Sequence, residues 1–108
     1  MQDRPEFIVV LVTAPSREEA VKIARTLVHE RLVPCANLIP KIESVYWWDN
    51  EVQENEETLC IIKARSADFE AVRQRVLELH SYEVPEIIAV PITAGHDDYF
   101  SWFRQYVK

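Results

Sequence analysis

The stretch Phe7-Ile-Val-Val-Leu-Val-Thr-Ala14 decides how this chain folds. It is rich in β-branched residues and contains no charge, proline or glycine, which predicts a buried strand. Successive side chains of a strand point to opposite faces of the sheet. Val9 and Leu11 therefore face one way, while Val10 and Val12 face the other. Both faces of this strand are apolar, so both must be covered in the folded protein.

An amphipathic helix follows this strand. Ser16 and Glu19 have the spacing of a capping box, in which each side chain satisfies a free backbone N–H group where a helix starts. Apolar residues then recur every three or four positions from Ala20 to Leu32, and the helix ends before Pro34. The rest of the pattern predicts strands at 35–48, 52–65 and 86–93, a second helix that Ser66 caps, and a short last helix at 97–107.

The order of these elements predicts an α+β protein with the ferredoxin-like βαββαβ arrangement and an extra C-terminal helix. In that arrangement the four strands form one antiparallel sheet, and the two longer helices lie on one face. The second face of the sheet is apolar too, and it would form a patch too large for a soluble monomer. We expect other copies of the chain to bury it. The alternative is that the last helix alone folds over it.

The composition excludes several classes of function. The length of 108 residues is typical of one domain, spanning 1–108. The single glycine, Gly95, excludes the dinucleotide fingerprint and the P-loop, which each need several glycines. The net charge of −6 and the lack of a basic run argue against nucleic-acid binding. No apolar run approaches the roughly 20 residues of a membrane span, and no signal peptide is recognised, so we expect a cytoplasmic protein.

The two cysteines are expected to be free thiols. Cys35 and Cys60 lie in predicted strands among apolar neighbours, where a thiol is usually an unreactive packing group. A hairpin turn at 50–51 places Cys60 opposite Lys41, which is roughly 20 Å along the strand from Cys35. This distance predicts no disulfide between them, as expected in a reducing compartment.

His80 is the most interesting of the three histidines. It ends the second predicted helix, and Tyr82, Glu83 and Glu86 follow it around Pro85. Such a polar cluster at the end of an element is either a binding site or a solvated loop, and the spacing leaves both interpretations open. The chain has neither Cys-x-x-Cys nor His-x-x-x-His spacing. It also has no evident nucleophile and base, so we expect no catalytic residue.

Two further features point to binding. Lys63 is a lone charge within the apolar segment 59–64, so it needs either a carboxylate such as Glu57 or Glu86, or an anionic ligand. The aromatic run Tyr46-Trp47-Trp48 has side chains too large to be left in solvent on a hairpin without a function. Aromatic side chains of this size anchor interfaces or line pockets.

Five segments resemble the CutA family of divalent-cation tolerance proteins. They occur in the order and with the separations found in that family, and the resemblance extends from about Ile8 to Val107. The segments are Cys35-Ala-Asn-Leu-Ile-Pro40, Ser44-Val-Tyr-Trp-Trp48, Ile61-Ile-Lys63, Leu79-His-Ser-Tyr-Glu-Val-Pro-Glu86 and Tyr99-Phe-Ser-Trp102.

The resemblance implies a ferredoxin-like protomer and a tight homotrimer, with an architecture shared with the PII signalling proteins. It implies a role in tolerance to divalent metals, copper especially, and no enzymatic activity. In such a trimer the ligand would bind in a cleft between protomers. Here that cleft would be lined by Tyr46, Trp47, Lys63, His80, Tyr82, Glu86 and Trp102.

The copper ligands that the resemblance implies are only partly present. In some members of the family, copper ligation is attributed to a cysteine on the first strand and to a pair of histidines that ends the second helix. Val12 stands at the cysteine position of this chain, and the pair is Leu79-His80. His80 is the one ligand that remains, so a copper site would have to recruit Glu83, Glu86 or a neighbouring protomer.

Two functions are therefore expected. The first is a trimeric binding protein for divalent cations of the copper class, which acts in metal-ion homeostasis. The alternative is a PII-like signalling trimer that binds a small anionic metabolite, with Lys63 as the counter-charge. An enzyme, or a purely structural trimer of high stability, has less support from the sequence.

Overall fold

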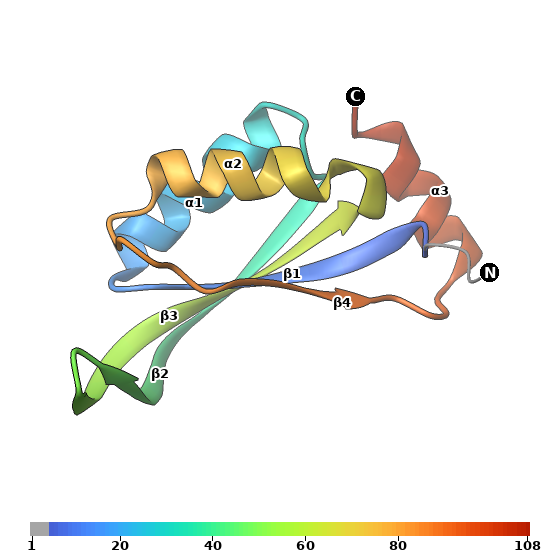
Figure 1. Ribbon diagram of the computed structural model, residues 1–108. Coiled ribbons are helices and arrows are strands. Elements are labelled where there is room, and N and C mark those ends of the chain that lie inside the picture. Colours follow the sequence, from blue (N-terminus) through green and yellow to red (C-terminus); the bar gives the residue numbers. More distant parts are fainter. Residues whose placement is uncertain (1–4) are drawn as a thin grey trace.

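The computed structural model describes residues 5–108, and its order of elements is the predicted one (Figure 1). A short 3-10 segment, Ser66–Asp68, precedes the second helix. The strands are β1 (Phe7–Ala14), β2 (Cys35–Trp48), β3 (Glu51–Arg65) and β4 (Ile87–Pro91), and the helices are α1 (Arg17–His29), α2 (Phe69–Leu79) and α3 (Asp97–Gln105).

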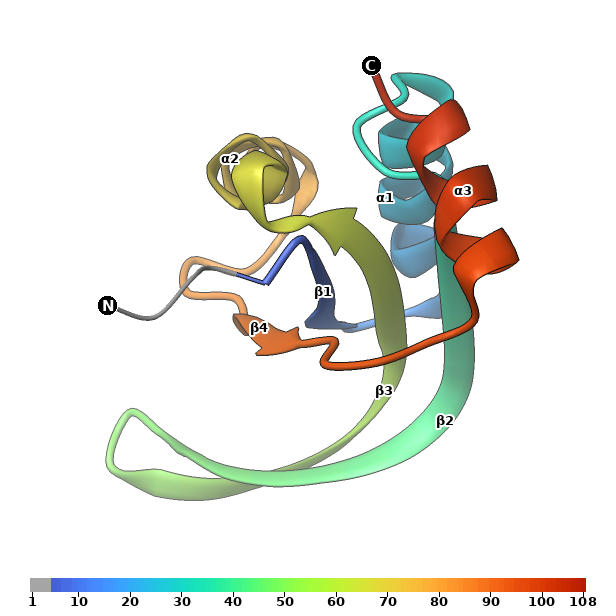
Figure 2. The same cartoon turned by 90° about the vertical axis from the view of Figure 1, so that its right-hand side faces the viewer.

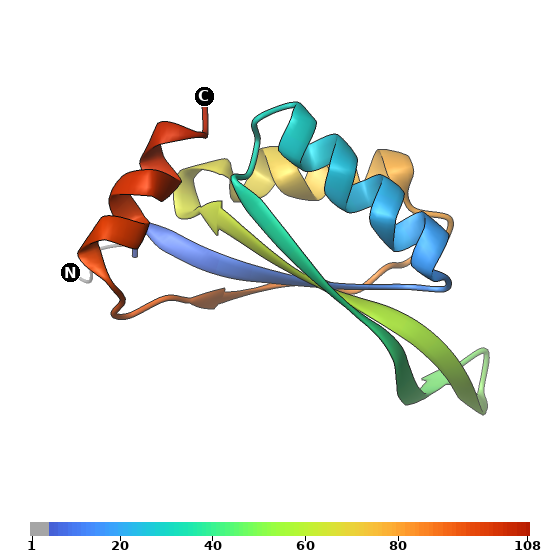
Figure 3. The same ribbon diagram turned by 180° about the vertical axis from the view of Figure 1, so that it is seen from behind.

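The four strands form one antiparallel sheet in the order β2-β3-β1-β4, which confirms the ferredoxin-like α+β fold. Helices α1 and α2 lie side by side over one face of this sheet (Figures 1 and 3). Helix α3 lies beside the C-terminal end of α1 and away from α2 (Figure 2), and the Lys108 N–H group after α3 donates to the Arg31 carbonyl after α1 at 3.1 Å. Within residues 5–108, no helix is long and apolar enough to cross a membrane.

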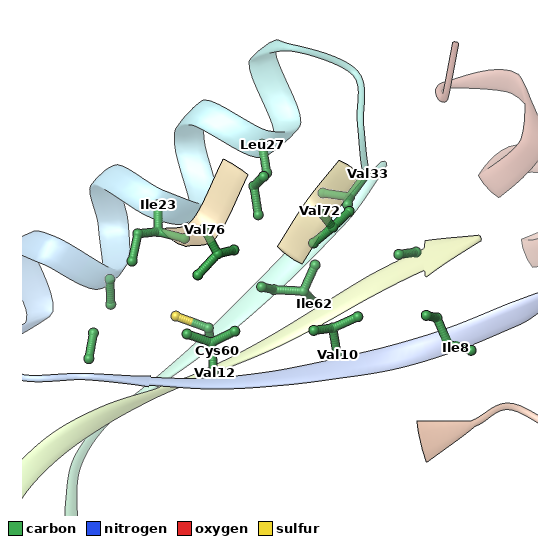
Figure 4. Packing of buried hydrophobic residues seen from close by; sticks show 13 residues of the cluster. Ile8, Val10, Val12, Ile23, Leu27, Val33, Cys60, Ile62, Val72 and Val76 are labelled. Carbon is green, nitrogen blue, oxygen red and sulfur yellow. The ribbon is translucent and has the colours of Figure 1, made fainter. Parts of the chain in front are cut away.

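The hydrophobic core lies between the sheet and the helices α1 and α2 (Figure 4). Val10 and Val12 of β1 are fully buried there, as predicted for this face. Burial of each such side chain stabilises the fold by about 1.5–3 kcal/mol. The remaining large members of the core are Ile8 of β1, Ile23 and Leu27 of α1, Val33 of the loop before β2, Cys60 and Ile62 of β3, and Val72 and Val76 of α2.

Within residues 5–108, the second face of the sheet is covered at one end only. Phe7 is 4% exposed because Phe100 and Phe103 of α3 pack against it, with ring centroids 4.6 and 4.4 Å away. Farther along this face, Ile88 and Val90 of β4 are 51% and 46% exposed. Helix α3 therefore does not cover the face alone, and an apolar surface remains open in the single chain.

The hairpin register differs from the predicted one. A two-residue turn, Asp49-Asn50, joins the paired residues Trp48 and Glu51, and both turn residues have the positive φ that such tight hairpin turns require. The pairing then shifts at a bulge between Ile39 and Ile42, next to Pro40. These two features were missing from the predicted register, which was therefore wrong.

With the observed register, Cys60 pairs with Leu38 and not with Lys41. Cys35 pairs with Lys63, so both cysteines are free, as expected. Burial raises the pKa of the Cys60 thiol to about 11, and the neutral thiol is the form that suits a packing residue.

One of the two predicted helix caps is wrong. Ser16 caps α1, because its hydroxyl accepts a hydrogen bond from the Glu19 backbone N–H at 3.2 Å. Ser66 does not cap α2: its hydroxyl donates to the carbonyl of Pro5, and its backbone starts the short 3-10 segment instead. The Ser66 hydroxyl was available for this longer-range bond, which local spacing does not reveal.

Gly95 is required by the space around it. A Cβ atom at this position would lie 2.7 Å from Cε2 of Phe100, a contact closer than side chains tolerate. The ring of Phe100 has little freedom to move, since it is stacked on Phe7 with an angle of 8° between the planes. The single glycine of the chain therefore allows α3 to pack on the second face.

We predict that Gly95→Ala lowers the free energy of unfolding by about 1–3 kcal/mol, as overpacking usually does. Urea denaturation followed by circular dichroism would measure this. In the double variant with Phe100→Leu, the alanine should cost clearly less than in the wild-type background, because the stacked ring is gone. An equal cost in both backgrounds would contradict this explanation.

Candidate functional site

A cavity of about 780 Å³ lies between the far half of the β2–β3 hairpin and the loop that joins α2 to β4. We call it the hairpin pocket. Both segments lie at the end of the molecule away from α3 (Figure 1). Its walls are residues 44–48 of β2, Glu57 of β3, Thr13 of β1 and residues 81–86 of the loop.

The hairpin pocket is acidic. Among residues 5–108, its walls contain the carboxylates Glu57, Glu83 and Glu86 and no lysine, arginine or histidine. Opposite charge is what stabilises a bound ion in a partly desolvated site. The pocket therefore suits a cation and disfavours an anion.

Glu57 and Tyr82 form the floor of this pocket. Glu57 is only 6% exposed, and the hydroxyl of Tyr82 donates a hydrogen bond to its Oε2 at 2.8 Å. Burial and the neighbouring Glu57 carboxylate raise the pKa of Tyr82. Within residues 5–108, no ion pair neutralises Glu57. A buried carboxylate of this kind is costly unless a cation approaches it.

His80 lies directly behind the pocket and supports its loop. The side chain is fully buried, its Nδ1 accepts a hydrogen bond from the Tyr82 backbone N–H at 3.0 Å, and its Nε2 lies 2.7 Å from the Thr13 carbonyl. The Thr13 carbonyl can only accept, so Nε2–H donates the hydrogen bond to it, while Nδ1 faces both the Tyr82 N–H group and the carboxylate of Glu19, whose Oε2 lies 3.3 Å away. Both ring nitrogens are thus occupied, and neither offers a free lone pair to a metal ion.

The predicted cleft residues lie in two places. Tyr46, Trp47, Tyr82 and Glu86 line the hairpin pocket, with His80 next to it. Lys63 and Trp102 lie elsewhere, toward α3. A single chain does not bring the whole predicted set together.

Lys63 has no carboxylate partner among residues 5–108. Its ammonium group donates to the side chain of Asn37 and lies 3.9 Å from Sγ of Cys35. Of the two alternatives for Lys63, the ion pair with Glu57 or Glu86 is absent there, since Lys63 pairs with Cys35 in the sheet whereas Glu57 pairs with Ile42 and Glu86 lines the pocket. Trp102 stacks on Tyr99 of the same helix, with centroids 5.4 Å apart.

The donors of the chain do not fit a preformed copper site. Copper prefers imidazole and sulfur ligands, but Val12 is buried in the core at the position of the family's cysteine, and Leu79 packs against that core. Among residues 5–108, no group of three histidine, cysteine, aspartate or glutamate side chains could hold a metal ion. The carboxylates of the hairpin pocket are the type of ligand that oxygen-preferring cations bind, but they do not form a complete coordination shell.

Sequence reasoning missed Ser44, Trp48 and Glu57 as pocket residues. Trp48 stood in the aromatic run, and Glu57 was considered only as a partner for Lys63. The burial of Glu57 has a faint signal in the sequence, since this carboxylate lies two positions before the apolar residues 59–62. Its contact with Tyr82 spans 25 positions, which no local pattern reveals.

We predict that His80 is structural, so that His80→Leu lowers the free energy of unfolding by about 1–3 kcal/mol. The substitution leaves the Thr13 carbonyl and the Tyr82 N–H group without partners, and each such loss is costly. Guanidinium denaturation measures the change, with His29→Leu as a control at an exposed position of α1. Equal stability of the two variants would contradict this role.

Comparisons with known proteins agree with the fold and its motifs. The profile of the family described as CutA1 divalent ion tolerance protein matches residues 8–106. The chain is 45% identical over 97 residues to the divalent-cation tolerance protein CutA of Thermus thermophilus, covering 90% of this chain and 94% of that one. It is 47% identical over 97 residues to the chloroplastic protein CutA of Arabidopsis thaliana. That match covers 90% of this chain but only 53% of the plant protein, so the chain spans about half of its length.

Solved structures give the same result. The divalent cation tolerance protein of Thermus thermophilus superimposes with a TM-score of 0.91 at 43% identity, covering 94% of this chain and 99% of that chain. CutA1 of Oryza sativa superimposes with a TM-score of 0.93 at 40% identity, covering 96% and 95%. With a profile match over nearly its whole length, the chain belongs to the CutA1 divalent ion tolerance protein family.

Proposed function

We propose that this protein acts in divalent-cation tolerance by binding divalent cations in the hairpin pocket. The single observation that carries the proposal is the charge of that pocket, whose walls, as far as the described part of the chain forms them, have three carboxylates and no basic side chain. The family name and the names of the relatives, which include "divalent-cation tolerance", support the same direction. The role is binding, without catalysis.

The chemistry of the pocket favours cations that prefer oxygen ligands. Glu83 and Glu86 lie on the loop and Glu57 on the floor, so carboxylates are present on two sides. Hard cations such as Mg²⁺ and Mn²⁺ bind through one or two carboxylates and keep several water ligands. We expect weak binding, with the remaining ligands supplied by water or by a neighbouring protomer. Copper binding is tested in the same titration.

We also propose that the protein is a homotrimer. The open second face of the sheet, with Ile88 and Val90, and the exposed hairpin side chains Val45 and Val52 support assembly, because such apolar surfaces mark interfaces. A neighbouring protomer is also the means by which Lys63 and Trp102 would come close to the hairpin pocket. The free thiols support a reducing compartment such as the cytoplasm.

The anionic alternative has less support. It needs Lys63 as the counter-charge, and Lys63 lies outside the hairpin pocket, bonded to Asn37. A signalling trimer of the PII type would therefore have to form its anion site at the second face, from more than one protomer.

We predict a solution mass of three times the 12.7 kDa of the chain. Burial of the second face is the driving force, so the paired substitutions Ile88→Lys and Val90→Lys should lower the mass. Light scattering after size-exclusion chromatography measures it, with Leu77→Lys on the exposed side of α2 as the control. A monomeric wild-type protein would contradict the trimer.

We predict saturable binding of divalent cations that depends on the pocket carboxylates. Removing the charge of one carboxylate in the variants Glu57→Gln and Glu86→Gln should weaken binding roughly tenfold, which corresponds to ~1.4 kcal/mol. Calorimetric titration with Mg²⁺, Mn²⁺, Zn²⁺ and Cu²⁺ would measure the affinities.

The control for this titration is Glu78→Gln. Glu78 is an exposed residue of α2 with a 63% exposed side chain, and it lies outside the hairpin pocket. Equal affinities in the wild type, the two pocket variants and this control would show that the metal ion binds outside the hairpin pocket. No binding of any of the four ions would refute the proposed function.

A further inference from the structure

The loop that joins α2 to β4, residues 80–86, carries two of the three carboxylates of the hairpin pocket, Glu83 and Glu86. Within residues 5–108, no backbone N–H group of residues 81–86 donates to a backbone carbonyl. A loop without backbone hydrogen bonds of its own depends on side chains to hold it in one conformation. The side chains that hold this loop therefore decide where the two carboxylates lie.

Glu19, in the first turn of α1, is one of these side chains. Its Oε2 atom accepts hydrogen bonds from both the backbone N–H group and the hydroxyl of Ser81, each at 3.0 Å. The same oxygen lies 3.3 Å from Nδ1 of His80, and the Glu19 side chain is only 18% exposed. Hydrogen bonds to a charged group are roughly twice as strong as neutral ones. One oxygen atom thus joins α1 to a loop that lies 62 positions away in the chain.

The direction of the Glu19 side chain differs from the one that the sequence predicts. In a complete capping box, the Glu19 carboxylate would accept a hydrogen bond from the Ser16 N–H group. Only half of this box forms. The Ser16 hydroxyl accepts from the Glu19 N–H group, but within residues 5–108 both hydrogen bonds of the Glu19 carboxylate come from Ser81. The carboxylate therefore serves the loop and not the helix end.

The contacts continue from Ser81 to the floor of the pocket. The Tyr82 N–H group donates to Nδ1 of His80 at 3.0 Å, and the Tyr82 hydroxyl donates to Glu57 at 2.8 Å. All of these contacts lie within one chain, so they do not depend on which surfaces the proposed homotrimer buries. Together they hold the two residues of the loop that come directly before Glu83.

We propose that Glu19 is a positioning residue of the cation site, which fixes the loop 80–86 at the hairpin pocket and so presets Glu83 and Glu86. Glu19 itself lies outside the walls of the pocket. A preset site binds more tightly, because less of the protein has to be ordered when the ligand binds. The role in cation binding rests on the proposed function, whereas the anchoring of the loop is a property of the protein alone.

Three substitutions separate the position of this side chain from its charge. Glu19→Gln removes the charge but keeps an oxygen that can accept both hydrogen bonds of Ser81. Glu19→Asp keeps the charge, but its carboxylate is one methylene group shorter and withdraws from Ser81. Glu19→Ala removes both. Glu18→Ala is the matched control, because Glu18 is an exposed residue of the same helical turn.

Hydrogen exchange of the segment 80–86, followed by mass spectrometry on the metal-free full-length protein, measures the anchoring. We expect exchange at least about tenfold faster in Glu19→Ala and Glu19→Asp, since hydrogen bonds to a charged group are lost. Glu19→Gln and Glu18→Ala should stay close to the wild-type rate. The strand β1 should exchange equally in all variants, because the opening is local. Equal exchange of the segment in Glu19→Ala and Glu18→Ala would overturn the proposal.

Calorimetric titration measures the consequence for binding, with whichever of Mg²⁺, Mn²⁺, Zn²⁺ and Cu²⁺ the wild type binds most tightly. Glu19→Ala and Glu19→Asp should weaken binding about fivefold, which corresponds to ~1 kcal/mol, close to the cost of ordering one residue. Glu19→Asp keeps the comparison possible if Glu19→Ala impairs folding. A Glu19→Gln variant that behaves like Glu19→Ala would overturn the proposal, because the charge and not the position would then matter.

The outcome is separable from that of the proposed function. If the wild type binds none of the four ions, the proposed function fails, and hydrogen exchange alone supports or overturns the anchoring of the loop by Glu19. If the wild type and all variants bind the ion equally, the proposed function stands and the positioning role of Glu19 is overturned.

Discussion

The apolar side chains on both faces of β1 impose the constraint on which the rest of the structure depends. This strand pairs with β3 along one edge and with β4 along the other, so it lies inside the sheet. Its two apolar faces therefore lie within the two faces of the sheet. Helices α1 and α2 cover the face of Val10 and Val12. In the described part of the chain, helix α3 alone packs on the second face, next to Phe7, and it approaches this closely because Gly95 has no side chain.

The second face changes in chemistry along its length, and this change positions the candidate site. At the α3 end it is aromatic and closed, around Phe7. In the middle it is apolar and open, at Ile88 and Val90. Near Thr13 it borders the hairpin pocket, where carboxylates and aromatic rings replace aliphatic side chains. The proposed cation site lies in this last region, because carboxylates favour positive charge.

Predictions from the sequence were most accurate where the cause is local. The periods of β1, α1 and α2 are visible within short windows, and the capping of α1 by Ser16 depends on residues three positions apart. The hairpin register could not be predicted from such local patterns. It depends on the turn at Asp49 and Asn50, which both have positive φ, and on the shift in pairing after Ile39. His80 was recognised as important, but its buried position and its two hydrogen bonds give it a supporting role rather than a free imidazole.

The sequence by itself determined the order of strands and helices, the two apolar faces and the family, because these are encoded in periodicity and in short ordered motifs. Only the tertiary structure decided which charges and rings share a pocket. The contact of Glu57 with Tyr82 spans 25 positions, and that of His80 with Thr13 spans 67. Such pairs form when distant elements pack together, so Lys63 and Trp102 lie away from the pocket although their motifs are as clear as that of His80.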